Sequence, residues 1–160
     1  MTTTVAHDQV HAIAQEVFAA MVDGDLGLLL PWEGELPALD DALVAWVDLF
    51  GDWSGRAVLV TAEGTAQELT RALMGLHPDE PVERADLEDA FGEIANVVGG
   101  NLKALLPNPG TLGLPRIGSD LPPLEGAVRA LHLPLSWRGR LFVVDVWVTT
   151  AAGSTTEGAS

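Results

Sequence analysis

The sequence predicts an α+β fold in which two β-hairpins form an antiparallel sheet and helices pack on it. Two pairs of apolar segments, within residues 43–61 and 127–149, are each joined by a short turn that contains glycine, as in β-hairpins. Three further segments carry apolar residues at the three- and four-residue spacing of amphipathic helices. Because the strands of a hairpin pair antiparallel, we expect the helices to lie on one face of the sheet.

The first expected element is a helix over residues 5–21, where apolar residues recur at helical spacing. The segment Asp23-Gly24-Asp25 is expected to end this helix. Residues 24–41 contain prolines, glycines and acidic residues, and they predict a loop that can include a short edge strand.

The first hairpin is expected to have strands at residues 43–50 and 56–61, with a glycine at each end of its five-residue turn. A second helix should follow over residues 63–74 and end at Gly75. The inward face of this helix is expected to hold Ala66, Leu69, Leu73 and Met74.

The longest expected helix spans residues 84–107. Its apolar stripe comprises Leu87, Phe91, Ile94, Val98, Leu102 and Leu105, with Ala90 and Val97 at the margin. The opposite, exposed side is expected to carry Asp89, Glu93, Asn96, Gly100 and Lys103. Each of the adjacent glycines Gly99 and Gly100 costs about 1 kcal/mol relative to alanine inside a helix. Close approach by another backbone is one reason to place them there.

Residues 107–123 hold five of the ten prolines and predict an irregular segment, which Leu112, Leu114 and Ile117 can hold against the core. The second hairpin is expected to comprise strands at residues 127–137 and 141–149. Alternation in the last strand favours a core face formed by Phe142, Val144, Val146 and Val148. Residues 1–150 therefore predict one domain, and residues 151–160 predict a flexible tail of small and polar residues.

Composition excludes several classes of function. The chain of 160 residues is 48% hydrophobic, which favours one domain with a sizeable core. Its net charge of −15 argues against binding to nucleic acid or to an anionic membrane. No apolar stretch approaches the roughly 20 residues that span a bilayer, and the first residues do not resemble a signal peptide. The absence of cysteine excludes disulfides and thiol catalysis and is compatible with the cytoplasm, where we expect the protein.

Several polar groups in the sequence are not expected to have a catalytic role. The sequence contains no phosphate-binding glycine loop, dinucleotide fingerprint or nucleophile elbow. His7 and His11 can share a helix face, but no third ligand stands at suitable spacing, so we expect a solvent-facing pair. The acidic pair at 40–41 is expected to lie in a loop, and the pair at 88–89 on a solvated helix face. Asn101 projects toward the apolar stripe, and we expect it to tie the helix to a neighbouring backbone, because a buried amide requires hydrogen-bond partners.

Glu93 and Asn96 are the strongest candidates for a functional site, with a solvated helix face as the alternative. They lie three residues apart, so their side chains are neighbours on the exposed face. Asparagine is a poor helix former, yet Asn96 lies in the middle of this helix. A carboxamide both donates and accepts hydrogen bonds, so it can orient a water molecule, but it is not a strong base. The pair therefore suggests assisted hydrolysis of a labile bond that a partner protein supplies.

Residues 91–103, FGEIANVVGGNLK, resemble the signature helix of the CheX/CheC/FliY-type chemotaxis phosphatases, GE(I/L)xNxxxGNxK, with an additional glycine at position 99. Residues 47–60 are similar to the strand–GxxxG–strand segment of that family. Residues 114–118 are similar to its LPxxxxG-like segment, although Pro115 and Gly118 are closer together here. The resemblance extends from about residue 5 to residue 149 and implies a CheC-like α+β fold.

The resemblance implies an aspartyl-phosphate phosphatase that acts on a response-regulator receiver domain of the CheY type. Asn96 would position the attacking water, and Glu93 would dock on the lysine of the receiver's active site. Other residues of the same helix are expected to contact the receiver: Asp89, Gly99, Gly100 and Lys103. The Mg²⁺ ion would be held by the receiver, so we expect this chain to hold no cofactor or metal.

Some members of this family carry a second E-x-x-N motif in the first helix. Here Glu16 is followed by Ala19 where that motif requires asparagine, so the single-motif, CheX-like arrangement fits. That arrangement implies a homodimer built through the sheet, and exposed strand edges make such pairing reasonable. Two alternatives are a non-catalytic module that binds a receiver or a flagellar-switch protein and, more remotely, a stand-alone metalloenzyme.

Overall fold

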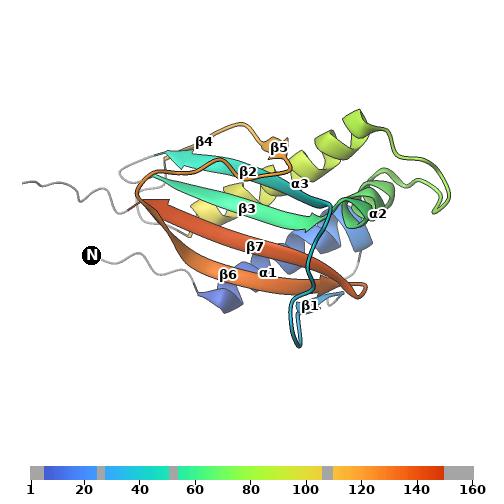
Figure 1. Ribbon diagram of the computed structural model, residues 1–160, viewed down its shortest axis with the longest axis horizontal. Coiled ribbons are helices and arrows are strands. Elements are labelled where there is room, and N and C mark those ends of the chain that lie inside the picture. Colours follow the sequence, from blue (N-terminus) through green and yellow to red (C-terminus); the bar gives the residue numbers. More distant parts are fainter. Residues whose placement is uncertain (1–5, 25–27, 51–53, 106–109, 150–160) are drawn as a thin grey trace, which may run out of the picture.

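The computed structural model describes residues 6–24, 28–50, 54–105 and 110–149 (Figure 1). Its strands form a single sheet in the order β1-β6-β7-β3-β2-β4, in which β5 also pairs with β2 and every pairing is antiparallel. The strands are β1 (Leu29–Pro31), β2 (Ala42–Phe50), β3 (Gly55–Ala62), β4 (Thr111–Leu112), β5 (Arg116–Gly118), β6 (Ala127–Trp137) and β7 (Arg140–Thr149).

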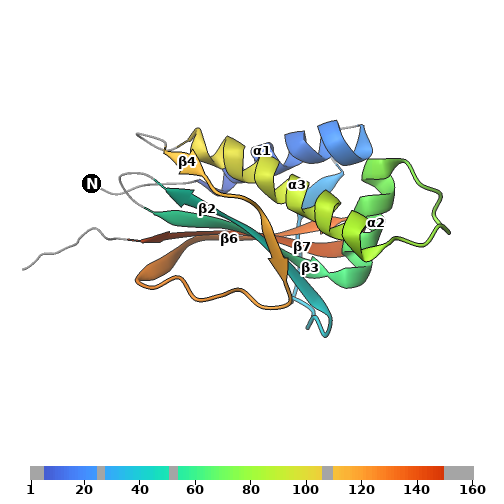
Figure 2. The same ribbon diagram turned by 90° about the horizontal axis from the view of Figure 1, so that it is seen from above.

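Three α-helices cover one face of this sheet (Figure 2). They are α1 (His7–Phe18), α2 (Glu63–Met74) and α3 (Arg84–Lys103). The two predicted hairpins, β2–β3 and β6–β7, pair with each other through β3 and β7 in the centre of the sheet. The predicted α+β class and the placement of the helices are therefore confirmed.

Helix α1 continues as one π-helical turn over Ala19–Asp23 and ends at Gly24, which has a left-handed φ of 78°. The predicted stop at this glycine is confirmed. The Asp23 carboxylate accepts hydrogen bonds from Trp137 Nε1 at 3.0 Å and from Arg138 Nη2 at 2.8 Å. These contacts fasten the end of the first helix to the turn between β6 and β7.

Helix α3 ends at Lys103, four residues before the end predicted for it at residue 107. The amide of Leu105 donates to the carbonyl of Leu102 at 3.0 Å, which closes the helix with a tighter turn. Pro107 itself lies outside the described residues. Its presence explains the early end, because a proline ring clashes with the carbonyl four residues earlier in a continuing helix.

The core lies between the helices and the sheet. Phe142 of β7 makes edge-to-face contacts with Phe18 of α1 at 5.0 Å and with Phe91 of α3 at 6.4 Å, measured between ring centroids. The predicted apolar stripe of α3 is buried up to Leu102, whereas Leu105 is half-buried beyond the helix end. The predicted core face of the last strand is also confirmed, with Val148 half-buried at its end.

Two predicted core residues are exposed. Met74 is 45% exposed, because it is the last residue of α2 and lies about 140° around the helix axis from the buried Leu69. Leu114 is 85% exposed, because its segment carries one extra residue where it pairs with β2.

On the other face of the sheet, the segment that connects β5 to β6 lies over part of the sheet, near β2 and β3 (Figures 1 and 2). Arg56 of β3 is only 7% exposed, and its Nη1 donates to the carbonyl of Pro122 in that segment at 2.7 Å. The Nε of Arg56 donates to Asp48 Oδ1 at 2.5 Å. A small apolar cluster around Val44, Trp46 and Val58 fills this side.

Candidate functional site

The exposed face of α3 presents the predicted pair of side chains. Glu93 is exposed and Asn96 is half-buried. Three residues of an α-helix rise about 4.5 Å, so the two side chains leave the helix within one turn of each other. Asp89, one turn before Glu93, is exposed as predicted, and Gly100 is half-buried one turn beyond Asn96.

The carboxylate of Glu93 and the carboxamide of Asn96 are not engaged inside the described part of the chain. The side-chain hydrogen bonds of α3 there join Arg84 to Glu88 and to Glu63, at 3.0 and 3.3 Å, and Asn101 to a backbone carbonyl. As far as the described residues go, both functional groups are therefore available to an external partner.

Asn101 does not occupy the buried position that its sequence register suggested. It is exposed, and its Nδ2 donates to the carbonyl of Val97 one turn earlier at 2.8 Å. The prediction of burial is wrong, because the buried sector of α3 is displaced away from Asn101 toward Gly92, Ala95 and Gly99. The expectation that Asn101 ties α3 to a neighbouring backbone is also wrong, because its amide bonds a carbonyl of its own helix.

Small residues form a second packing face on α3, of which the sequence suggested only a close approach at Gly99 and Gly100. A Cβ atom on Gly92 would lie 3.5 Å from Pro115 Cβ, and one on Gly99 would lie 3.1 Å from Val47 Cγ2. Ala95, between them, is 1% exposed. The three- and four-residue spacing of these small residues was the signal that could have predicted a closely approaching neighbour.

The position of Gly99 corrects the predicted partner surface. We expected Gly99 beside Glu93 and Asn96 on the exposed side, but it is buried against β2 and Leu112. Its lack of a side chain lets the helix approach the sheet. Gly100 is different, because the nearest atom to an added Cβ would be Leu112 Cδ2 at 3.9 Å.

An open hollow of about 620 Å³ borders Glu93. Helix α3 contributes Glu88, Asp89, Gly92 and Glu93, and the segment of β5 contributes Pro115 and Ile117. The lining therefore combines three carboxylates with two apolar side chains, and Glu88 is paired with Arg84. Such a hollow fits the aliphatic stem and cationic head of a lysine or arginine side chain. Asp89 and Glu93 are thus brought together, as predicted.

Lys103 is not part of this hollow. It is half-buried at the last position of α3, ten residues beyond Glu93. Ten residues correspond to about 15 Å along a helix axis. Any contact of Lys103 with a partner would therefore involve a surface well separated from the carboxylates.

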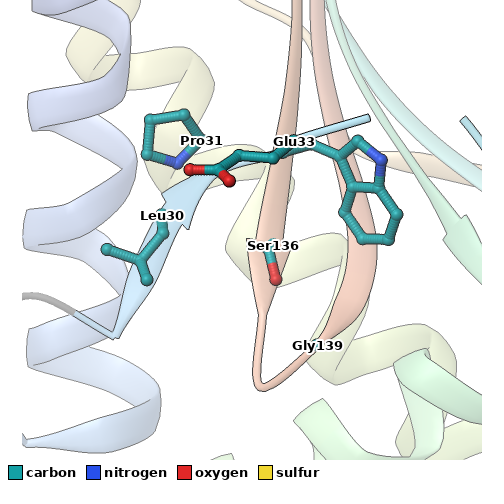
Figure 3. A pocket seen from close by; sticks show the side chains of 6 residues that line it. Leu30, Pro31, Glu33, Ser136 and Gly139 are labelled. Carbon is teal, nitrogen blue, oxygen red and sulfur yellow. The ribbon is translucent and has the colours of Figure 1, made fainter. Parts of the chain in front are cut away.

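A second hollow of about 480 Å³ lies at the opposite edge of the sheet, between β1 and the turn that follows β6 (Figure 3). Its lining residues are Leu30, Pro31, Trp32, Glu33, Ser136 and Gly139. Glu33 is the only carboxylate among them. Among the described residues this hollow offers no acid–base pair, which favours the exposed face of α3 over it as the candidate site.

Other titratable groups have structural roles. A ring nitrogen of His11 lies 2.8 Å from the carbonyl of Leu29, so this histidine links α1 to β1. His7, its predicted companion, is exposed. The hydrogen bond from Arg84 to Glu88 raises the pKa of the arginine. Across the described ranges, no group of three or more histidine, aspartate or glutamate side chains is placed to hold a metal ion. None of the helices described there is long and apolar enough to cross a membrane.

The chain matches the sequence model of the family described as chemotaxis phosphatase CheX over residues 43–121, a range that contains all of α3. No curated protein matches the chain significantly in sequence.

Solved structures share its fold. The chemotaxis protein CheX from Vibrio vulnificus is 18% identical, with a TM-score of 0.64 over 91% of this chain and 99% of that one. A chain of the CheX–CheY–BeF₃–Mg²⁺ complex from Borrelia burgdorferi is 16% identical, with a TM-score of 0.70 over 89% and 96% of the two chains. A CheC-like superfamily protein from Shewanella is 16% identical, with a TM-score of 0.61 over 88% and 95%. The family match and these shared folds agree with the sequence signature on α3, and together they support a CheX-like member of the chemotaxis phosphatase family.

Proposed function

We propose that this chain accelerates the hydrolysis of the phospho-aspartate in a CheY-type response-regulator receiver domain. The observation that carries the proposal is the pair Glu93 and Asn96, one turn apart on the exposed face of α3 and without partners among the described residues. The similarly folded chain from Borrelia burgdorferi occurs in a complex with CheY, which supports a receiver as the partner.

In this proposal Asn96 acts by positioning. Its carboxamide oxygen accepts a hydrogen bond from a water molecule, and its NH₂ group donates to an oxygen of the phosphoryl group or of the receiver. The oxygen of the water attacks phosphorus as the bond between phosphorus and the aspartyl oxygen breaks, which gives a free carboxylate and inorganic phosphate. The Mg²⁺ ion held by the receiver supplies most of the charge stabilisation, so this chain needs no metal for the step.

Glu93 acts by docking. Its carboxylate forms a charge-assisted hydrogen bond with the lysine in the active site of the receiver. The neighbouring Asp89 adds negative potential at the same hollow. This pairing fixes the distance between Asn96 and the phosphoryl group.

A phosphate-release assay with a cognate phospho-receiver tests the proposal. Asn96→Ala should lower the acceleration by about 100-fold, the scale on which misplacement of a reacting group reduces a rate. Asn101→Ala is the matched control, because Asn101 is an exposed asparagine on the same helix that bonds its own backbone. The control should retain full activity. Full activity of Asn96→Ala would contradict the assigned role, and binding without any change in phosphate lifetime would favour the non-catalytic alternative.

We also propose a homodimer formed through the sheet. Among the described residues, β1 pairs with β6 at residues 135–137, and the amide of Trp32 donates to the carbonyl of Pro134. In the described part of the chain, the outer edge of β6 over residues 127–133 is left without a pairing strand. Val128 on this segment is 53% exposed. Sedimentation velocity should give twice the monomer mass of 16.9 kDa, and a monomeric species at micromolar concentration would contradict the dimer.

A further inference from the structure

Residues 111–118, which we call the strap, run along the edge of β2 that does not pair with β3. The strap contains one residue more than the stretch of β2 beside it. The strap is in register with β2 at two places, where Leu49 is opposite Leu112 and Trp46 is opposite Arg116. Between these pairs, residues 113–115 of the strap are opposite only residues 47–48 of β2. The strap therefore carries one extra residue here, as in a β-bulge, which bends the strand and can redirect a side chain.

The bulge is held firmly on both sides of Leu114. The amide of Gly113 donates to the carbonyl of Asp48 at 2.7 Å. A Cβ atom on Gly113 would lie 3.3 Å from Phe50 Cε2 and 3.4 Å from the carbonyl oxygen of Asp48, so this position has little room for a side chain. On the other side, Pro115 packs on Gly92 of α3. Leu114 between them is 85% exposed.

The strap runs antiparallel to α3, so Leu114 lies beside the proposed site. Leu112 is next to Gly99 and Gly100, whereas Pro115 is next to Gly92. Three residues of the strap therefore run alongside seven to eight residues of the helix. The two lengths agree, since three extended residues span about 10 Å and seven helical residues about 11 Å. Leu114, one residue from Pro115, is level with the turn of α3 that carries Glu93 and Asn96. Figure 2 shows the strap alongside this helix.

Leu114 has the properties of a preorganised binding residue. A leucine that is 85% exposed on a free loop would be unremarkable, but this one is fixed by a hydrogen bond, a tight glycine and a proline. The backbone of Leu114 is therefore already ordered and loses little conformational entropy when the residue is covered. Its neighbour Pro115 already lines the hollow beside Glu93, so Leu114 extends that surface with an apolar group.

We propose that Leu114 is an apolar anchor for the phospho-receiver, which inserts into an apolar depression next to the phosphorylation pocket. The inference rests on the proposed function and assigns a further residue to the same docking surface. Glu93 supplies the charged contact, Asn96 orients the water, and Leu114 contributes burial of apolar surface to affinity. Leu114 does not touch the reacting atoms, so it changes binding and not chemistry.

Initial rates of phosphate release, measured against the concentration of phospho-receiver, test this assignment. Leu114→Ala should raise the half-saturating concentration about tenfold, equivalent to about 1.4 kcal/mol, and leave the maximal rate unchanged. Leu114→Met should restore most of the affinity. Leu36→Ala is the matched control, because Leu36 is a leucine 46% exposed in the segment between β1 and β2. It should behave as the wild type.

Binding of the receiver to the Asn96→Ala variant, with and without Leu114→Ala, separates the two proposals, since it needs no turnover. An unchanged half-saturating concentration in Leu114→Ala with active wild type would overturn only the anchor. A lower maximal rate with an unchanged half-saturating concentration would also overturn the anchor role of Leu114. A change in oligomeric mass in Leu114→Ala would overturn it too, because it would assign Leu114 to a contact between two copies of the chain. If the wild type neither binds the receiver nor accelerates phosphate loss, both proposals fail.

Discussion

A Cβ atom on Gly99 would lie 3.1 Å from Cγ2 of Val47, which shows how closely helix α3 approaches strand β2. Only a residue without a side chain fits this approach without displacing its neighbours. The adjacent Gly100 faces a more open space beside Leu112. Two consecutive glycines that look equivalent in the sequence therefore have different roles in the structure.

The two glycines should respond in opposite ways to substitution. Gly99→Leu should lower the free energy of unfolding by about 2 kcal/mol, because overpacking displaces Val47 or Leu112. Gly100→Ala should raise it by about 0.5–1 kcal/mol, because alanine favours the helix and its Cβ meets no atom closer than 3.9 Å. Urea unfolding followed by circular dichroism measures both changes. A stability loss in Gly100→Ala as large as that in Gly99→Leu would refute the distinction.

Glu93→Gln should weaken docking of the receiver more than it slows the chemical step. The substitution removes the charge but keeps the shape, so the half-saturating concentration should rise about tenfold, as for loss of a charged hydrogen bond. The difference from wild type should shrink as salt is added, because screening weakens the wild-type attraction.

Glu16→Gln provides the matched control for Glu93. Glu16 is exposed on α1, at the position that the resemblance assigns to the other glutamate of two-motif members. Because Ala19 replaces the asparagine of that motif, this substitution should leave the half-saturating concentration unchanged. An equal effect of both substitutions would indicate a general charge effect and not docking at Glu93.

The burial of the Asp145 carboxyl group predicts that the stability of the fold depends on pH. Asp145 is 7% exposed on β7, with its Oδ1 2.7 Å from His132 Nδ1 and its Oδ2 3.8 Å from Arg129. Burial raises the pKa of Asp145 above its ordinary value of 3.8, and the hydrogen bond from His132 and the charges of His132 and Arg129 only partly oppose this. Between pH 3.8 and the raised pKa, the folded chain binds more protons than the unfolded chain. The contribution of Asp145 to the free energy of unfolding therefore falls as pH rises through this range.

The measurement compares wild type with Asp145→Asn by urea unfolding from about pH 3.5 to 6, where the other carboxylates cancel in the difference. The stability of wild type relative to the variant should decrease as pH rises. Repeating the comparison in a His132→Gln background removes the contribution of the imidazole and should steepen the decrease. A difference that is constant or that increases with pH would contradict the raised pKa.

The elements with strong periodicity were predicted well from the sequence. Helix α2 and strand β6 have the predicted bounds, because an amphipathic helix between clear stop signals and a long alternating strand both leave local patterns. The hairpin partners were also predicted, since adjacent strands joined by short turns pair with each other. The predicted Gly51–Gly55 turn falls largely outside the described residues, as does the tail at 151–160.

The segment after α3 was not predicted in the same detail. Strands β4 and β5 contain two and three residues, too few to show a period. They form because the edge of β2, more than 60 residues earlier in the chain, offers hydrogen-bonding groups. The bulge that exposes Leu114 follows from the register of that long-range pairing, so the expectation that Leu114 is a core residue could not be corrected from the sequence.

The sequence by itself determined that α3 is a helix with Glu93 and Asn96 one turn apart on its exposed side, because the direction of a helical side chain depends only on its position along the chain. It also contained the signature that identifies the family. The tertiary structure alone decided which side of α3 meets a second neighbour. It buried Gly99 against β2, left Asn101 and Leu114 exposed, and placed Pro115 at the hollow beside Glu93. These outcomes depend on contacts between residues far apart in sequence, which local periodicity does not encode.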